Sequence, residues 1–209
     1  MLDGAPAAPS RRVTGTRDLP VGGWLETGPE ERAFVKVADI GNVNVDPRTR
    51  VRLIRTRAGE HRLELAHGTL HATILAPPGQ FFVETPSAVV VDLGCAYTLT
   101  IDEGGAGLVS VTLGWVGFEW RGRESFIPAG FRGATRPGVG PGTPYYMDSA
   151  APVIAALDII DFAPGSPEAV AAIDVVLAAA GERDEATLWH LLSRVGVDGT
   201  ALGVAALVA

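Results

Sequence analysis

A long series of short apolar runs, separated by residues that favour turns, fills the middle of the chain. Between Ala33 and Ile127 the runs are rich in Val, Ile, Leu, Phe and Thr, and each is about as long as one strand. Pro-Pro-Gly, Thr-Pro-Ser and Glu-Gly-Gly separate them, as tight turns require. Apolar and polar residues alternate within many runs, which directs one face of each strand inward. The pattern predicts an all-β domain that is a sandwich, a jelly roll or a short solenoid.

Twelve strands are expected from these runs. They lie at Trp24–Leu25, Phe34–Val37, Val43–Val45, Val51–Arg55, Leu63–Leu65, Leu70–Ile74, Phe81–Glu84, Ala88–Leu93, Ala96–Ile101, Leu108–Leu113, Trp115–Trp120 and Glu124–Ile127. His67-Gly68 is expected to turn the chain between two of them. The stretch 134–146 carries Pro or Gly at nearly every other position and is expected to hold no regular structure.

The period of the apolar residues changes after this stretch and indicates helices. One is expected over Ala151–Phe162, a second from a Ser166 cap to about Ala180, and a third over Asp184–Val195, with Leu188, Leu191, Leu192 and Val195 as its apolar positions. A fourth is expected to begin after Asp198 or Thr200. The helices are either the beginning of a helical repeat or a small cap on the β domain.

These patterns divide the chain into four parts. We expect a flexible N-terminal segment at 1–19, an all-β domain at 20–135, a Pro- and Gly-rich connection at 136–148 and a truncated α-helical region at 149–209. The fold class is therefore mainly β with a small helical C-terminal region.

Composition excludes several classes of protein. Hydrophobic residues make up 47% of the 209 positions and charged residues 20%, which excludes a disordered chain. The net charge of −7 disfavours a nucleic-acid partner, since phosphate binding needs a concentrated basic face. The most basic stretch, Arg48 to Arg62, alternates with apolar residues and is expected to be a solvated strand face. The chain has neither an apolar run of transmembrane length nor a signal peptide at its start.

Few residues suggest chemistry. His61, His67 and His71 are the only clustered histidines, and they would form a metal site only if the turn at Gly68 kept them on one face. The single cysteine, Cys95, is expected to be a buried small residue. Asp92 lies in an apolar run and must find a hydrogen-bond donor there. No phosphate loop or nucleophile elbow is present, so we expect no catalytic residue, metal or cofactor.

The best candidates for a partner-binding site are aromatic and arginine residues near the end of the β domain. They are Trp120, Arg121, Arg123, Tyr145 and Tyr146. Such residues often anchor protein interfaces. The alternative is that Trp115 nearby belongs to the core and that the others only line a loop.

The β region resembles the FecR domain family. Gly68–Leu75 is similar to that family's opening run, Phe81–Leu99 to its Phe-x-Val-x-Thr-Pro core, Gly107–Trp120 to its hairpin and Phe126–Gly130 to its closing motif. The resemblance extends over about Arg32 to Thr135. Gly94-Cys95-Ala96-Tyr97 departs from the family's usual Gly-Thr-x-Phe but keeps residues of similar size.

The resemblance implies a non-enzymatic, extracytoplasmic domain of a membrane-anchored regulator that passes a signal to a sigma factor. It implies a protein partner, either a receptor or a signalling component, and a membrane attachment through segments absent from this chain. The alternative from the residues alone is a small-ligand or carbohydrate-binding β domain, including a cupin-like enzyme. Convergence of His61, His67 and His71 on a cavity would favour that alternative, whereas a filled interior would favour the regulator.

Overall fold

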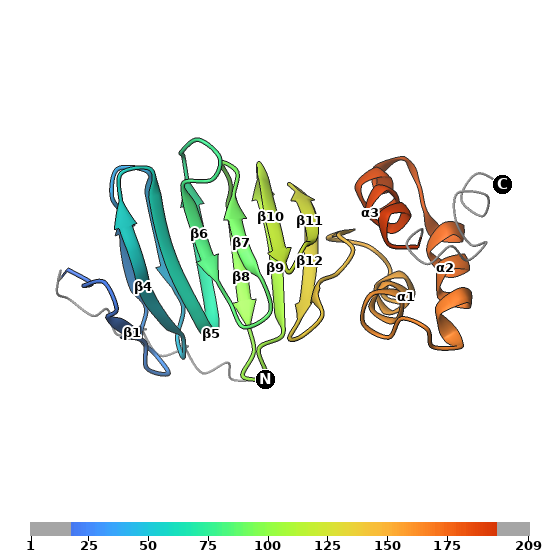
Figure 1. The fold of residues 1–209 in the computed structure, drawn as a ribbon, viewed down its shortest axis with the longest axis horizontal. Coiled ribbons are helices and arrows are strands. Elements are labelled where there is room, and N and C mark those ends of the chain that lie inside the picture. The colour runs from blue at the N-terminus through green and yellow to red at the C-terminus, as the bar shows by residue number, and fades with distance from the viewer. Residues whose placement is uncertain (1–17, 196–209) are drawn as a thin grey trace, which may run out of the picture.

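The computed structural model describes residues 18–195, which form a β sandwich followed by three α-helices (Figure 1). The predicted fold class is confirmed, and of the three predicted β architectures the sandwich is the one found. The predicted segment 1–19, except for its last two residues, and the predicted fourth helix lie outside the described residues.

Two sheets make up the sandwich and share one long strand, β5 (Glu60–Ile74). The first sheet has the order β1–β4–β5–β6–β7–β10–β11 and the second the order β2–β3–β5–β8–β9–β12. All pairs are antiparallel except β5 with β6. The other strands of the first sheet are β1 (Trp24–Glu26), β4 (Arg50–Arg57), β6 (Phe81–Glu84), β7 (Val89–Asp92), β10 (Trp115–Trp120) and β11 (Arg123–Pro128). Those of the second are β2 (Ala33–Val37), β3 (Gly41–Val45), β8 (Ala96–Ile101), β9 (Gly107–Leu113) and β12 (Phe131–Arg136), with the two-residue strands β13 (Gly140–Pro141) and β14 (Tyr145–Tyr146) beside β12.

The predicted turn at His67-Gly68 is wrong, because β5 continues through these residues and passes from one sheet to the other. A bulge next to β4 places one extra residue at this point. Core-facing positions consequently change from odd numbers, such as Leu63, to even numbers, such as Leu70. Gly68 has φ +100°, and a Cβ there would lie 2.4 Å from the Thr49 Cα, so the crossing needs glycine.

The core lies between the two sheets. Its largest fully buried side chains include Tyr97, Phe81, Phe118, Leu65 and Leu70. They come from the core-facing positions of the alternating runs, so the predicted period-two pattern describes the packing well.

The stretch 134–146 is more regular than the sequence predicts. β12 continues to Arg136, and β13 and β14 both pair with it. Proline is tolerated here because β13 and β14 are short outer strands, where a missing N–H removes little of the ladder.

The three helices lie together beyond β11 and β12, at one end of the sandwich (Figure 1). They are α1 (Ala151–Phe162), α2 (Glu168–Ala179) and α3 (Glu185–Val195), with a short 3₁₀ turn η1 (Glu182–Asp184) before α3. The predicted cap at Ser166 is wrong, since the residue before α2 is Pro167 and the Ser166 hydroxyl has no partner. A second apolar cluster, which includes Leu157, Val176 and Leu191, packs the helices together.

Candidate functional site

A buried carboxylate joins the helices to the sandwich. Asp161 on α1 is only 2% exposed, and its Oδ1 lies 2.9 Å from the Arg123 Nη2 on β11 and 2.5 Å from the Arg194 Nη1 on α3. Its two oxygens also accept hydrogen bonds from the backbone N–H and the hydroxyl of Thr143, at 2.6 and 3.1 Å. We call Asp161, Arg123, Arg194 and Thr143 the Asp161 cluster. It ties two helices, the last strand of the first sheet and the connecting segment to one another.

Helix α3 covers the outer edge of β11. The Phe126 backbone N–H donates to the His190 Nε2 at 2.9 Å, and the Arg194 Nη2 donates to the Glu124 carbonyl at 3.3 Å. His190 Nδ1 donates to the Ala186 carbonyl at 2.7 Å, so the ring is the neutral tautomer with its proton on Nδ1. Burial lowers the pKa of His190, which is consistent with that neutral form. Two polar side chains of α3 thus satisfy an edge that would otherwise be open.

Three of the predicted partner-binding residues lie at the β10–β11 hairpin. Arg121 and Gly122 form its two-residue turn with φ +49° and +83°, the geometry of a type I′ hairpin. The Arg121 side chain is exposed and lies over the Trp120 ring, 5.3 Å from its centroid. Trp120 packs against Gly140, whereas Arg123 is held by Asp161 and by the Pro141 carbonyl at 2.6 Å. Arg121 and Trp120 are therefore the two that remain near the surface.

The other two predicted residues lie near the opposite end of β12. Tyr146 packs edge-on against Phe131, with ring centroids 5.3 Å apart, and the Arg183 guanidinium lies 4.6 Å from the Tyr146 centroid. Tyr145 is buried in the apolar cluster of the helices. The structure does not bring the five predicted residues to one surface, and Arg123, Tyr145 and Tyr146 are engaged between the sandwich and the helices.

The alternative interpretation placed Trp115 in the core, and the structure does not. It is half exposed, while its neighbour Val116 is fully buried. The alternation of β10 accounts for this, because only one of two successive residues can face the core.

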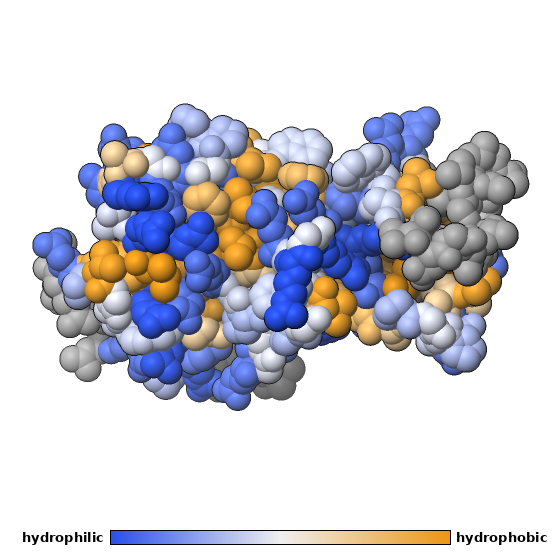
Figure 2. Space-filling view, in the orientation of Figure 1, coloured by the Kyte–Doolittle hydropathy of each residue, from blue (hydrophilic) through white to orange (hydrophobic). Residues whose placement is uncertain are grey.

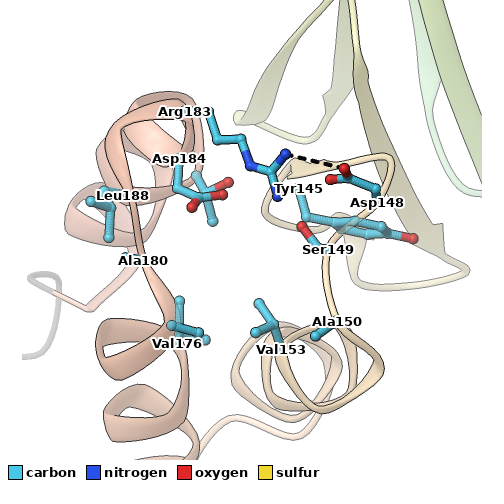
Figure 3. A pocket seen from close by; sticks show the side chains of 12 residues that line it. Tyr145, Asp148, Ser149, Ala150, Val153, Val176, Ala180, Arg183, Asp184 and Leu188 are labelled. Atoms are coloured by element: carbon cyan, nitrogen blue, oxygen red, sulfur yellow. Dashed lines mark hydrogen bonds and ion pairs between the residues drawn. The ribbon is translucent and has the colours of Figure 1, made fainter.

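A hollow of about 200 Å³ lies between the helices and the segment that leads into α1 (Figure 3). Val153 and Val176 face it from α1 and α2, and at its other side Arg183 pairs with Asp148 at 3.1 Å. A second hollow of about 250 Å³ lies between α1 and β12. Both lie against the helices rather than within the β core.

The three clustered histidines do not converge. His61 is buried and its Nδ1 lies 2.8 Å from the Thr56 hydroxyl. His71 lies on the outer face, where its ring bonds with the Thr98 hydroxyl at 2.8 Å and the Asp46 carboxylate at 3.0 Å. The change of phase at Gly68 separates them. Within residues 18–195, no group of three His, Cys, Asp or Glu side chains could hold a metal ion.

Asp92 and Cys95 form a hydrogen bond with each other in the core. The Cys95 thiol donates to the Asp92 Oδ2 at 2.9 Å, and the Gly94 N–H donates to the other oxygen at 2.7 Å. Burial and the adjacent carboxyl raise the pKa of Cys95 strongly, so the thiol stays protonated. Burial also raises the pKa of Asp92. The sequence-based expectations for both residues are confirmed.

The basic stretch is a solvated strand face, as expected. Most of its arginines are paired with glutamates of the same sheet, for example Arg55 with Glu60 at 3.0 Å and Arg62 with Glu84 at 3.0 Å. Figure 2 shows hydrophilic and apolar residues intermixed over the β region in that view. Mutual pairing leaves little free positive charge for an anionic ligand.

Three of the residues that join the helices to the sandwich were not among the predicted site residues. Asp161, His190 and Arg194 lie on predicted helices, where polar residues are expected in solvent. The one available signal was the spacing of His190 and Arg194, which are four residues apart and therefore share a helix face.

No helix among residues 18–195 has the length and apolar character needed to cross a bilayer.

Part of the sandwich is similar to known proteins. Residues 24–117 match the family described as "FecR protein". No curated protein matches the chain. Two crystal structures of a "putative anti-sigma factor" from Parabacteroides distasonis are similar, each with a TM-score of 0.51 and 18% identity over 64% of this chain. The aligned part spans 63% and 62% of those chains, less than two thirds of their length, and at this identity the likeness concerns the fold alone. The match spans β1 to β9 and the first residues of β10, so this part of the β sandwich is similar to the FecR family.

Proposed function

We propose that this chain is the sensing and protein-interaction part of a FecR-type regulator. In this proposal the protein is anchored in a membrane, its β sandwich is extracytoplasmic, and it transmits a signal from a protein partner to a sigma factor. The family match supports a regulator of this type, and the anti-sigma description of the structural neighbours is consistent with it.

The observation that carries the proposal is the filled, mainly apolar interior of the sandwich. Large apolar side chains fill the core, and the ionisable pair Asp92 and Cys95 is bonded internally. A reaction or a buried ligand would need converging polar groups and space within the core. A domain of this kind offers its surfaces and strand edges instead, which suits recognition of another protein.

The exposed tip of the β10–β11 hairpin remains our proposed contact for that partner. Arg121 lies over Trp120 there, so a planar cation and an aromatic ring are presented together. Arg123, Tyr145 and Tyr146 would act indirectly by holding the helices next to this hairpin. The cupin-like alternative gains no support, because His61 and His71 lie on different faces of β5.

Transcription in cells tests the proposal. A strain that lacks the gene is compared with strains that carry either the full-length gene or a version without residues 24–136. The proposal predicts that a limited set of promoters with one shared sigma-factor recognition sequence changes, and that only the full-length gene restores it. An unchanged transcriptome, or full restoration by the shortened gene, would contradict it. Arg121→Ala should give a partial loss of restoration, with the distant turn variant Gly59→Ala as the control.

A further inference from the structure

In the described part of the sandwich, one edge strand is open along its whole length. Helix α3 covers β11, β1 has three residues, and β13 and β14 have two residues each. β2 is different, because its five residues pair only with β3 and none is proline. Open edges are templates for pairing with another strand, and proteins usually cover or shorten them.

The backbone groups of Phe34 and Lys36 point to this open edge. On β3 the even-numbered residues face β5, since Asp46 N–H donates to the Thr69 carbonyl and Ile40 C=O accepts from Leu75. The odd-numbered residues of β3 therefore bond to β2, and their partners on β2 are Ala33, Val35 and Val37. The N–H and C=O groups of the even-numbered residues of β2 consequently face away from the sheet.

The side chains along β2 are unusual for an edge. Phe34 is 65% exposed on the outer face, next to Lys36, which is the only lysine in the chain. Ala33 and Val35 on the inner face are partly exposed and pack against the margin of the core. Burial of an exposed aromatic residue and of partly exposed aliphatic residues against a partner would be favourable.

We propose that β2 pairs antiparallel with β2 of a second copy of this chain, about a two-fold axis at Val35. In this register Val35 faces its own copy, Phe34 faces Lys36 of the other copy, and Ala33 faces Val37. Four backbone hydrogen bonds form between the Phe34 and Lys36 groups of the two chains. Lys36 is placed over an aromatic ring on each side, which is a favourable cross-strand pair.

Charge selects this register over its neighbours. Opposed residues must share a face, so the alternatives are shifts of two residues. A shift in one direction places Lys36 opposite Lys36, and these like charges repel. A shift in the other direction places Lys36 opposite Arg32, a second cation, although Arg32 also pairs with Asp46 at 2.8 Å. Lysine on an edge commonly prevents pairing. Here lysine disfavours the shifted registers and leaves one favoured two-fold arrangement, which is closed and cannot grow into a fibre.

The contact is small. Five residues per chain bury less surface area than a standard protein interface does, so the dimer should be weak and concentration-dependent. The inference rests on β2 alone and does not depend on the proposed function.

Cysteine cross-linking of the full chain tests the pairing. Val35→Cys places two thiols at a non-hydrogen-bonded pair, where the Cα atoms are about 4.5 Å apart and a disulfide fits. Phe34→Cys is the matched control, since its two copies would be about 7–8 Å apart on the diagonal. Cys95 is buried and should not interfere. We expect disulfide dimers of V35C and few or none of F34C under mild oxidation. Equal cross-linking of both, or of neither, would overturn the pairing.

Charge variants test the register independently by sedimentation. Phe34→Glu places a carboxylate opposite Lys36 of the other copy, whereas Phe34→Lys places two cations opposite each other. Both remove the exposed ring, so association through the ring alone would fall equally. We expect the dimer dissociation constant of F34K to exceed that of F34E by at least about tenfold. Equal constants, or a wild-type chain that stays monomeric at the highest soluble concentration, would refute the inference.

Discussion

Replacement of Asp161 by alanine should release the helices while the sandwich stays folded. The substitution removes a carboxylate that is 2% exposed and accepts bonds from Arg123, Arg194 and Thr143. Arg194 is 12% exposed, so its guanidinium would be left largely buried beside a second cation. Loss of one partner from a buried ion pair costs about 3–5 kcal/mol.

We expect the lower end of that range, because the Arg123 side chain is 30% exposed and water can reach it in part. About 3 kcal/mol corresponds to a rise of roughly 150-fold in the opening equilibrium of the docked helices. The core of the sandwich is a separate apolar cluster and should not share this loss.

Hydrogen–deuterium exchange with peptide resolution measures this directly. Peptides from 151–195 should exchange about two orders of magnitude faster in D161A, while those from β5 and β8 should be unchanged. Arg136→Ala is the control, because it breaks an exposed ion pair with Asp158 on the same helix and should cost less than about 1 kcal/mol. If D161A exchanged no faster than R136A, the Asp161 cluster would not hold the helices in place.

Three further predictions follow from single sites. Gly68→Ala should lower the free energy of unfolding by more than about 2 kcal/mol in urea titrations, because a Cβ meets backbone there, whereas Gly59→Ala, also at positive φ but in open space, should cost about 1 kcal/mol. Cys95 should resist alkylation at pH 8 in the folded chain and react fully in denaturant, as measured by mass spectrometry. Burial lowers the pKa of His190. The stabilisation that the neutral ring gives to the folded chain is therefore complete above the unfolded pKa of about 6.5 and is lost as the pH falls toward the pKa of the folded state. The protection factor of the Phe126 amide, which is its exchange rate corrected for the intrinsic pH dependence, should therefore fall on acidification in the wild type and lose that pH dependence in His190→Gln.

The sequence predicted the strands well because alternation and turn residues act locally. β6, β8 and β10 have the predicted limits, and α1 begins and ends as predicted. The passage of β5 between sheets could not be foreseen, because a glycine with positive φ can either reverse a chain or carry it across a bulge. Only the neighbouring strands decide between the two.

The candidate site was predicted less well, since its residues are polar and act over long sequence distances. Arg123 was singled out for a partner, but it binds Asp161, which lies 38 positions further along the chain. No local pattern reports such a pair. From the sequence alone, His190 and Arg194 are expected to face solvent. Only the three-dimensional structure shows that they bond with the edge of β11.

The location of the sandwich in the cell tests the proposed function most directly. Spheroplasts of cells that express the full-length gene product would be treated with protease, and the segment 32–146 followed with a specific antibody. The account predicts digestion from outside in intact spheroplasts, with a cytoplasmic marker protected in the same sample. Protection of the segment until the membrane is lysed, together with recovery in the cytosolic fraction, would contradict an extracytoplasmic sensing domain.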